Sequence, residues 1–276
     1  MELAHNDIVK RLIRRLEDAS YDLLEEWLAE MRESQPQFAA VADDELKSWM
    51  YSLILRIIQF LGEQEQITVL RTGGLVDLKQ VFYEAATQIV EAIEAQTEYT
   101  VGHCRRVRES AGKMAAMLNL TDEQIEDVEY AAGIHNIGLI NDAQRLYLEP
   151  RKLSDDELKR VRNHCVVGAE MLRPIEFLSN IVPMILYHHT HYDGSGYPGG
   201  LKGEQLPMGA RIIHICDAFH AMISPRPYRA ALSIEQALLE IDRSAGKQFD
   251  PKLIPLIHAV AQEITISAKT QSEVAE

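Results

Sequence analysis

Apolar residues recur at the spacing of an α-helix along almost the whole 276-residue chain, and no stretch keeps the two-residue alternation of a strand for long. This period predicts amphipathic helices over residues 3–33, 43–64 and 76–96, with breaks at Pro36 and at the glycine pair 73–74. Glycine and proline are otherwise sparse, which argues against a disordered or fibrous chain. The sequence therefore predicts an all-α fold.

Helix starts in the second half carry recognisable capping sequences. A Ser or Thr followed three residues later by Glu or Gln is a capping box, and it occurs at Thr121, Ser154 and Ser233. The Asp-Pro pair 250–251 is typical of an N-cap followed by proline in the first helical position. A glycine- and proline-rich stretch, 191–207, interrupts this pattern, and a long loop inside a helical domain is often functional.

The formal net charge of −14 makes a poor surface for nucleic-acid backbones and anionic membranes. We therefore expect no DNA and no membrane partner, although a metal ion or a few arginines could still attract a small anion locally. The chain has no signal-peptide pattern and no run of eighteen apolar residues, and its three cysteines include no CxxC pair. These features favour a cytoplasmic protein.

Five histidines and one aspartate lie on predicted helices or at helix ends. Imidazole and carboxylate together bind transition metals such as iron, manganese or zinc. Neighbours on a helix point about 100° apart, so His188 and His189 can reach one ion only near a helix end or where several helices surround it. The six candidate metal ligands are His103, His135, His164, His188, His189 and Asp217.

Each of the cysteines Cys104, Cys165 and Cys216 is next in sequence to one of these candidates. One interpretation is a redox-sensitive metal site. The other is that cysteine serves as a small buried hydrophobe, whose side chain points away from the site because helix neighbours diverge. We expect the second.

The string HHTHYDGSGYPGGLKGEQLPMGARII, residues 188–213, resembles the HD-GYP family of bacterial cyclic di-GMP phosphodiesterases. Four further segments are similar to that family and follow its order: YTVGHCRRV around His103, AGIHNIGLI around His135, NHCVVGAEML around His164 and ICDAFHAMISPRPYR around Asp217. The resemblance implies an HD-domain-like helical bundle, preceded here by an N-terminal helical domain.

The resemblance also implies a metal site and a nucleotide site. His103, His135 and Asp217 would hold one divalent transition metal, and His164, His188 and His189 would hold a second. The ions would be iron, manganese or another metal, one or two in number. Tyr197 of the Gly-Tyr-Pro triplet, together with Arg226 and Arg229, would contact cyclic di-GMP or a related nucleotide; a surface salt bridge is the other interpretation of the two arginines.

Several positions depart from the family pattern. Asn136 replaces the HD aspartate that would bridge two ions, and a neutral amide offsets none of the roughly 15–20 kcal/mol by which two divalent ions about 4 Å apart repel. Leu139 replaces a lysine that would neutralise a phosphate. Thr190 replaces the glutamate of the family's His-His-Glu sequence. Tyr99 replaces a glutamate that binds a third metal in some members. His220 replaces a second aspartate, and we expect it to be structural rather than a replacement ligand.

We expect an N-terminal sensor or dimerisation domain over residues 1–75, a linking helix over 76–98, the HD-GYP-like domain over 99–265 and a flexible tail over 266–276. Three functions remain open: a cyclic di-GMP signalling module with weak or lost phosphodiesterase activity that binds a ligand or a signalling protein, an active phosphodiesterase with an unusual metal centre, and a metal-free interaction module. A homodimer through the N-terminal helices is compatible with each.

Overall fold

The computed structural model describes residues 78–95, 97, 99–139, 142–147, 149, 151–173, 175–225 and 229–274. The N-terminal domain expected over residues 1–75, with its two helices and any dimer contact, lies outside these residues, as does Arg226. The chain divides into two units between Ile89 and Val90, within its first described helix, α3. The second unit, from Val90 onward, contains all of the candidate ligands.

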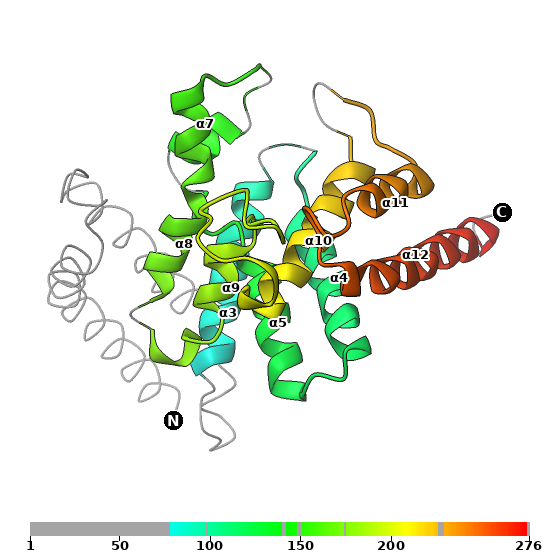
Figure 1. The fold of residues 1–276 in the computed structure, drawn as a ribbon, viewed down its shortest axis with the longest axis horizontal. Coiled ribbons are helices and arrows are strands. Elements are labelled where there is room, and N and C mark those ends of the chain that lie inside the picture. The colour runs from blue at the N-terminus through cyan, green and yellow to red at the C-terminus, as the bar shows by residue number, and fades with distance from the viewer. Residues whose placement is uncertain are drawn as a thin grey trace, which may run out of the picture. The chain divides into compact units, whose positions relative to one another are not determined.

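The described residues are helical and contain no β-sheet, only isolated bridges between Thr190 and Gly196 and between Ala245 and Phe249. The all-α prediction is therefore confirmed. Figure 1 shows the helices in chain order: α3 (Leu78–Glu94), α4 (His103–Met117), α5 (Asp122–Ile134), α6 (Asp142–Tyr147), α7 (Asp155–Arg162), α8 (His164–Leu172), α9 (Val182–Tyr187), α10 (Met208–Ile223), α11 (Ile234–Arg243) and α12 (Ile254–Val274), with 3-10 turns η3 (Glu176–Leu178), η4 (Gly203–Gln205) and η5 (Pro251–Leu253).

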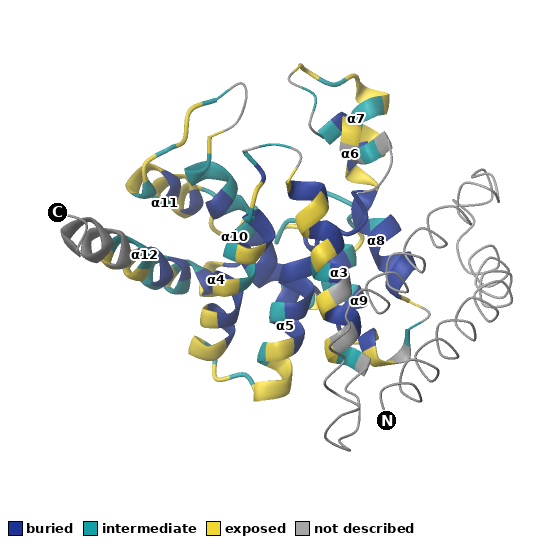
Figure 2. Ribbon diagram, turned by 180° about the vertical axis from the view of Figure 1, so that it is seen from behind, coloured by how far each residue is buried: buried dark blue, intermediate teal, exposed yellow. Residues whose placement is uncertain are grey.

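Helices α4, α5, α9 and α10 lie at the centre of the second unit, and Figure 2 shows buried residues concentrated there. Their inner faces carry residues such as Met114, Ile134, Ile185 and Phe219, all buried. Small residues let α4 approach α5 closely. A Cβ on Gly112 would lie 2.2 Å from Oε1 of Glu129 in α5. The burial of apolar side chains at this junction is the main force holding the central helices together.

The capping predictions are confirmed. Thr121, Ser154 and Ser233 each accept a hydrogen bond from the backbone N–H three residues later, and the Gln or Glu at that position reaches back to the cap. Asp250 accepts from the backbone N–H of Lys252 at 2.9 Å and starts η5. These caps satisfy N–H groups that the first turn of a helix leaves without a partner.

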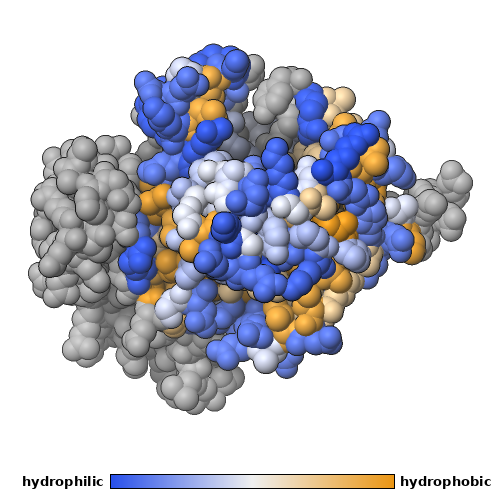
Figure 3. Space-filling view, viewed as in Figure 1, coloured by the Kyte–Doolittle hydropathy of each residue, from blue (hydrophilic) through white to orange (hydrophobic). Residues whose placement is uncertain are grey.

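The stretch 191–207 is irregular apart from η4, as expected. It is docked by backbone hydrogen bonds, since Tyr192 and Asp193 donate to the carbonyls of Gln248 and Lys247 at 3.0 and 2.9 Å. Figure 3 shows the face on which this loop lies, where hydrophilic and weakly polar residues predominate around the centre.

Helix α12 continues to Val274, and the flexible tail over 266–276 stays a prediction. Residues 266–274 contain neither glycine nor proline, so their polarity alone does not end the helix. None of the described helices is long and apolar enough to cross a membrane.

Candidate metal centre

Helix ends bring five of the six candidate ligands to one region. His103 and His164 are the first residues of α4 and α8, His135 and His188 follow the last residues of α5 and α9, and His189 comes next. Asp217 projects from the middle of α10. The structure gathers these residues into two groups, in each of which the potential ligand atoms lie within 4.8 Å of one another.

The first group consists of His103, His135 and Asp217, the combination that the family resemblance implies. Nε2 of His103 lies 2.9 Å from Oδ1 of Asp217, and the rings of His103 and His135 are 5.8 Å apart between centroids. Burial alone would raise the pKa of Asp217, but the hydrogen bond with His103 and the nearby imidazoles hold it well below its usual value. This group therefore offers one negative charge and two imidazoles.

The second group consists of His164, His188 and His189, with Cys165 added. Nε2 of His164 lies 3.3 Å from Nε2 of His188. Sγ of Cys165 lies 3.6 Å from the first of these nitrogens and 3.9 Å from the second. The expectation that the cysteines point away from the site is wrong for Cys165, and for Cys104, whose Sγ lies 3.6 Å from Nδ1 of His135.

The direction of the Cys165 side chain has a local cause. Neighbouring side chains on a helix diverge by about 100° rather than pointing to opposite sides, and His164 sits at the first position of its helix. Its ring turns back toward the carbonyl of Val161, three residues earlier, so that Nε2 swings to the side of Cys165. Sequence spacing does not reveal this rotation, because it depends on the side-chain torsions at the helix terminus.

Three imidazoles are oriented in the same way. His135, His164 and His188 each place Nδ1 against the carbonyl oxygen three residues earlier, at 2.7, 2.8 and 2.6 Å. A carbonyl can only accept, so Nδ1 carries the proton and Nε2 keeps its lone pair. His214 supports this arrangement by donating from Nδ1 to the carbonyl of His188 at 2.7 Å.

The facing nitrogens of His164 and His188 therefore meet as two acceptors. Burial lowers the pKa of His164 to about 4, and burial with neighbouring imidazoles lowers the pKa of His188 well below its usual value. Neither Nε2 carries a proton at neutral pH, yet the two nitrogens are 3.3 Å apart. A cation between them would remove this repulsion, so the donor set fits a metal ion.

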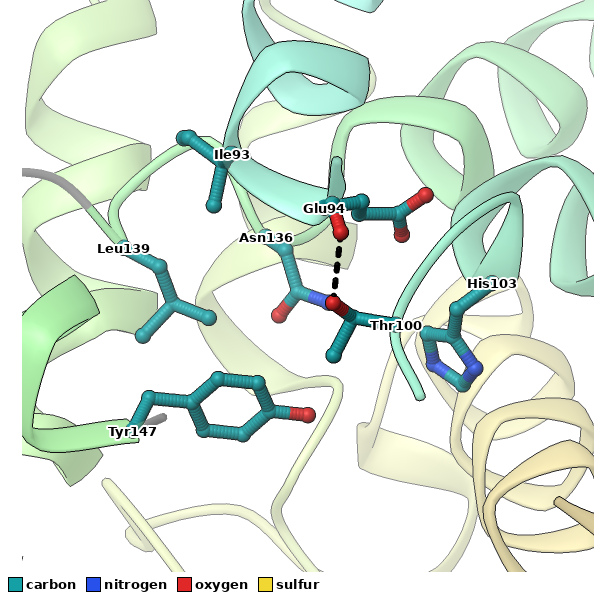
Figure 4. Close-up of a pocket in the computed structure, with 7 residues that line it drawn as sticks. All are labelled: Ile93, Glu94, Thr100, His103, Asn136, Leu139 and Tyr147. Carbon is teal, nitrogen blue, oxygen red and sulfur yellow. Dashed lines mark hydrogen bonds between the residues drawn. The ribbon is translucent and has the colours of Figure 1, made fainter. Parts of the chain in front are cut away.

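The altered HD position lies beside the first group. Asn136 is 8% exposed, and its Nδ2 lies 3.5 Å from Sγ of Cys104. A small pocket surrounds it, which Figure 4 shows with Asn136 between the apolar side chains of Leu139 and Tyr147 and the hydroxyl of Thr100. The residues that line it are Ile93, Glu94, Thr100, His103, Asn136, Leu139 and Tyr147.

This pocket lining contains no lysine or arginine, since the lysine of the family pattern is Leu139, which is 1% exposed. Glu94 is buried beside it, with Oε1 accepting from the backbone N–H of Cys104 at 2.7 Å. A phosphate placed here would meet a carboxylate and an apolar wall. The geometry thus gives the Asn136 and Leu139 replacements a direct electrostatic consequence.

The Gly-Tyr-Pro segment lies against the second group. The ring of Tyr197 is 4.8 Å from that of His189 between centroids, and the guanidinium of Arg162 lies 5.4 Å from the Tyr197 centroid. Gly196 has φ 84°, and a Cβ there would lie 2.4 Å from the carbonyl oxygen of His189. Thr190 holds the segment by donating from Oγ1 to the carbonyl of Tyr197 at 3.1 Å. The sequence reasoning missed Arg162, whose position beside Tyr197 depends on α7.

Two further candidates have other partners. Nη2 of Arg229 donates to the carbonyls of Ala221 and Met222 at 2.8 and 3.3 Å, near the end of α10. His220 places Nε2 2.7 Å from Oγ of Ser110 and belongs to neither ligand group. These contacts favour a structural role for His220. Because Nη2 of Arg229 already donates to backbone carbonyls, fewer of its N–H groups remain for a phosphate.

Comparison with known proteins shows the family to which the chain belongs. The family described as HD domain matches residues 88–253. A cyclic di-GMP phosphodiesterase response regulator of Xanthomonas campestris is 35% identical over 62% of this chain and 46% of its own length. A cyclic di-GMP phosphodiesterase of Thermotoga maritima is 31% identical over 64% and 50%. A 3'3'-cGAMP-specific phosphodiesterase of Vibrio cholerae is 30% identical over 66% and 35%.

Two solved structures share the fold. A cyclic GMP-AMP-specific phosphodiesterase of V. cholerae aligns with a TM-score of 0.52 at 20% identity, covering 65% of this chain and 48% of that one. An HD-GYP-type protein of Bdellovibrio bacteriovorus aligns with a TM-score of 0.52 at 16% identity, covering 80% and 71%. The chain belongs to the HD domain family, in its HD-GYP group. It spans half or less of the length of the curated relatives described above.

Proposed function

We propose that this chain is a metal-binding HD-GYP module of cyclic dinucleotide signalling, with weak or lost phosphodiesterase activity, that acts by binding a nucleotide or a protein partner. One observation carries the proposal. Both ligand groups are assembled, whereas the two neighbouring positions that would supply charge to catalysis are Asn136 and Leu139. The relatives that hydrolyse cyclic di-GMP or 3'3'-cGAMP support the substrate class.

The proposed metal ligands would form two ion sites. His103, His135 and Asp217 would hold one ion, and the second group would hold another. Paired divalent ions supply Lewis-acid chemistry to phosphodiester hydrolysis when a bridging anion keeps them close. Asn136 brings no negative charge for that purpose, and Leu139 brings no positive charge toward a phosphate. We therefore expect retained metal binding with little turnover.

The nucleotide would bind at the Gly-Tyr-Pro segment. Tyr197 offers an aromatic face for a guanine base, and the Arg162 guanidinium beside it offers a donor fork for a phosphate oxygen. Arg226 is a further candidate. These few cations are important because the chain as a whole carries a net charge of −14.

The test combines metal analysis with a nucleotide assay. The full chain would be loaded with Mn²⁺ or Fe²⁺, its metal content measured, and its binding and hydrolysis of cyclic di-GMP followed. We expect bound metal and nucleotide binding, with turnover far below that of an HD-GYP enzyme assayed in parallel. Two equivalents of metal with efficient turnover would overturn the proposal in favour of an active phosphodiesterase. Absence of both metal and nucleotide binding would favour a metal-free interaction module.

A repaired variant tests the reason given for low activity. Asn136→Asp with Leu139→Lys restores the family residues at both positions, and we expect it to raise metal content and hydrolysis together. The matched control is Leu139→Lys alone, which adds the phosphate partner without the bridging carboxylate. A double variant that binds no more metal than the parent would show that the account of this site is wrong.

A further inference from the structure

We propose that His164, Cys165, His188 and His189 form a closed, four-ligand site for a borderline-soft divalent cation such as Zn²⁺, with the Cys165 thiolate as the fourth ligand. The inference rests on the proposed function only in that the module binds metal. It assigns this second group a structural role, holding the start of α8 to the end of α9, rather than a hydrolytic one.

Three distances within the group, those among His164, Cys165 and His188, match the edges of a tetrahedral site. With metal–nitrogen bonds of about 2.0–2.1 Å and a metal–sulfur bond of about 2.3 Å, a regular tetrahedron requires nitrogen–nitrogen edges of about 3.3 Å and nitrogen–sulfur edges of about 3.6 Å. The His164–His188 nitrogens are 3.3 Å apart, and Cys165 Sγ lies 3.6 and 3.9 Å from them. His189 completes a set whose ligand atoms all lie within 4.8 Å.

The thiol proton of Cys165 cannot provide a hydrogen bond to both imidazole nitrogens that face it. Nε2 of His164 and of His188 both present lone pairs, because each ring uses its Nδ1 proton on a backbone carbonyl. The S–H of Cys165 can donate to one of them and leaves the other facing an acceptor in a buried place. A cation bound to the thiolate and the imidazoles satisfies every member of the group.

Ligand count separates this group from its neighbour. Four protein ligands fill a tetrahedral zinc site, which is the arrangement of structural sites, whereas catalytic sites keep one position open. The first group has three ligands, so it can keep a position open. Cysteine at 165 would also change metal preference, because thiolate favours Zn²⁺ and disfavours Mn²⁺.

Cobalt spectroscopy tests the assignment without using enzyme activity. The full chain, freed of metal with a chelator, would be titrated with Co²⁺, and its visible and near-ultraviolet absorption recorded. A thiolate bound to Co²⁺ gives a sulfur-to-metal charge-transfer band, and tetrahedral geometry gives intense visible bands. We expect both in the parent chain. Cys165→Ala should lose the charge-transfer band, and its Zn²⁺ affinity should fall on the order of 100-fold while Mn²⁺ affinity changes little.

The matched control is Cys216→Ala, since Cys216 is also buried and its Sγ contacts Sδ of Met114 instead of the imidazoles. It should keep the band. Cys165→Ser serves as a second variant, and circular dichroism shows whether each variant is folded. Co²⁺ bound without a charge-transfer band, or a band lost in Cys104→Ala instead, would overturn this inference and leave the proposed function standing. A parent chain that binds no Co²⁺, Mn²⁺ or Fe²⁺ would overturn both.

Discussion

The imidazoles of both groups in this domain come from helix ends, yet the two groups differ in charge and in the number of ligand-type residues. The first group combines two imidazoles with the Asp217 carboxylate and lies beside the neutral Asn136. The second group combines three imidazoles with one thiol, that of Cys165. The first resembles an open hydrolytic half-site that has lost its bridge. The second resembles a closed site. The comparison teaches that ligand-type side chains can remain gathered in two groups while the neighbouring positions 136 and 139 carry no charge.

The largest expected effect is the dependence of stability on pH. Burial lowers the pKa of His164 from its ordinary 6.5 to about 4. Between pH 6.5 and 4, His164 is protonated in the unfolded chain and neutral in the folded chain. The free energy of unfolding therefore falls as the pH falls. His164 alone accounts for about 3 kcal/mol by pH 4, and His188 and His189 add to it.

Asp217 contributes in a different window, because its pKa is held below the ordinary 3.8 and its stabilisation is lost only when the pH falls below that value. Urea unfolding of the chelator-treated chain between pH 7.5 and 4.5 therefore reports on the buried neutral imidazoles, which include His135 of the first group and also His214 and His220. His164→Gln should flatten the slope. A parent chain whose unfolding free energy is the same at pH 7.5 and pH 4.5 would contradict the buried neutral imidazoles.

The next effect is the loss of metal when one ligand is removed. His188→Ala should weaken metal binding at the second group by on the order of 100-fold or more, because even partners outside the ligand set contribute 10–100-fold to affinity. Competitive titration against a chelator measures it. The matched change in the first group, His103→Ala, should spare the second group, because His103 contacts Asp217 and lies beside His135. Equal losses from both variants would mean that the two groups do not bind independently.

A smaller effect should follow from the Gly-Tyr-Pro segment. Gly196→Ala places a Cβ at positive φ and 2.4 Å from the carbonyl oxygen of His189, so something must shift. We expect a loss of about 2 kcal/mol in the free energy of unfolding and weaker nucleotide binding. Thermal unfolding and isothermal titration with cyclic di-GMP check the two. Gly200→Ala is the comparison, since its Cβ meets nothing within 4 Å despite a similar φ.

The smallest effect concerns Thr190, which replaces the glutamate of the family pattern. Thr190→Val keeps the shape and removes the hydrogen bond from Oγ1 to the carbonyl of Tyr197. A partly buried carbonyl without that partner costs about 1 kcal/mol, measured as the free energy of unfolding in urea. An unchanged value would show that the segment is held by its backbone contacts alone.

Much of this domain was predictable because helices leave a strong periodic signal. The all-α fold, the caps at Thr121, Ser154 and Ser233, and the irregular stretch 191–207 follow from period, capping chemistry and glycine content. The bounds of α12, which runs to Val274, did not follow from the sequence, because residues 266–274 carry no helix-breaking residue that marks an end. The division of the ligand-type residues into two groups came from family resemblance, since spacing alone does not say which helix ends meet.

The sequence by itself determined which residue types lie at the helix ends and that Asn136 and Leu139 are neutral, because identity and period are properties of the chain. Only the tertiary structure decided that Cys165 faces the imidazoles, that Arg162 lies over Tyr197 and that Thr190 holds the loop. The physical reason is that a side chain's direction at a helix end depends on its torsions and on the backbone groups around it. Those groups come from segments far apart in the chain and meet only when the helices pack.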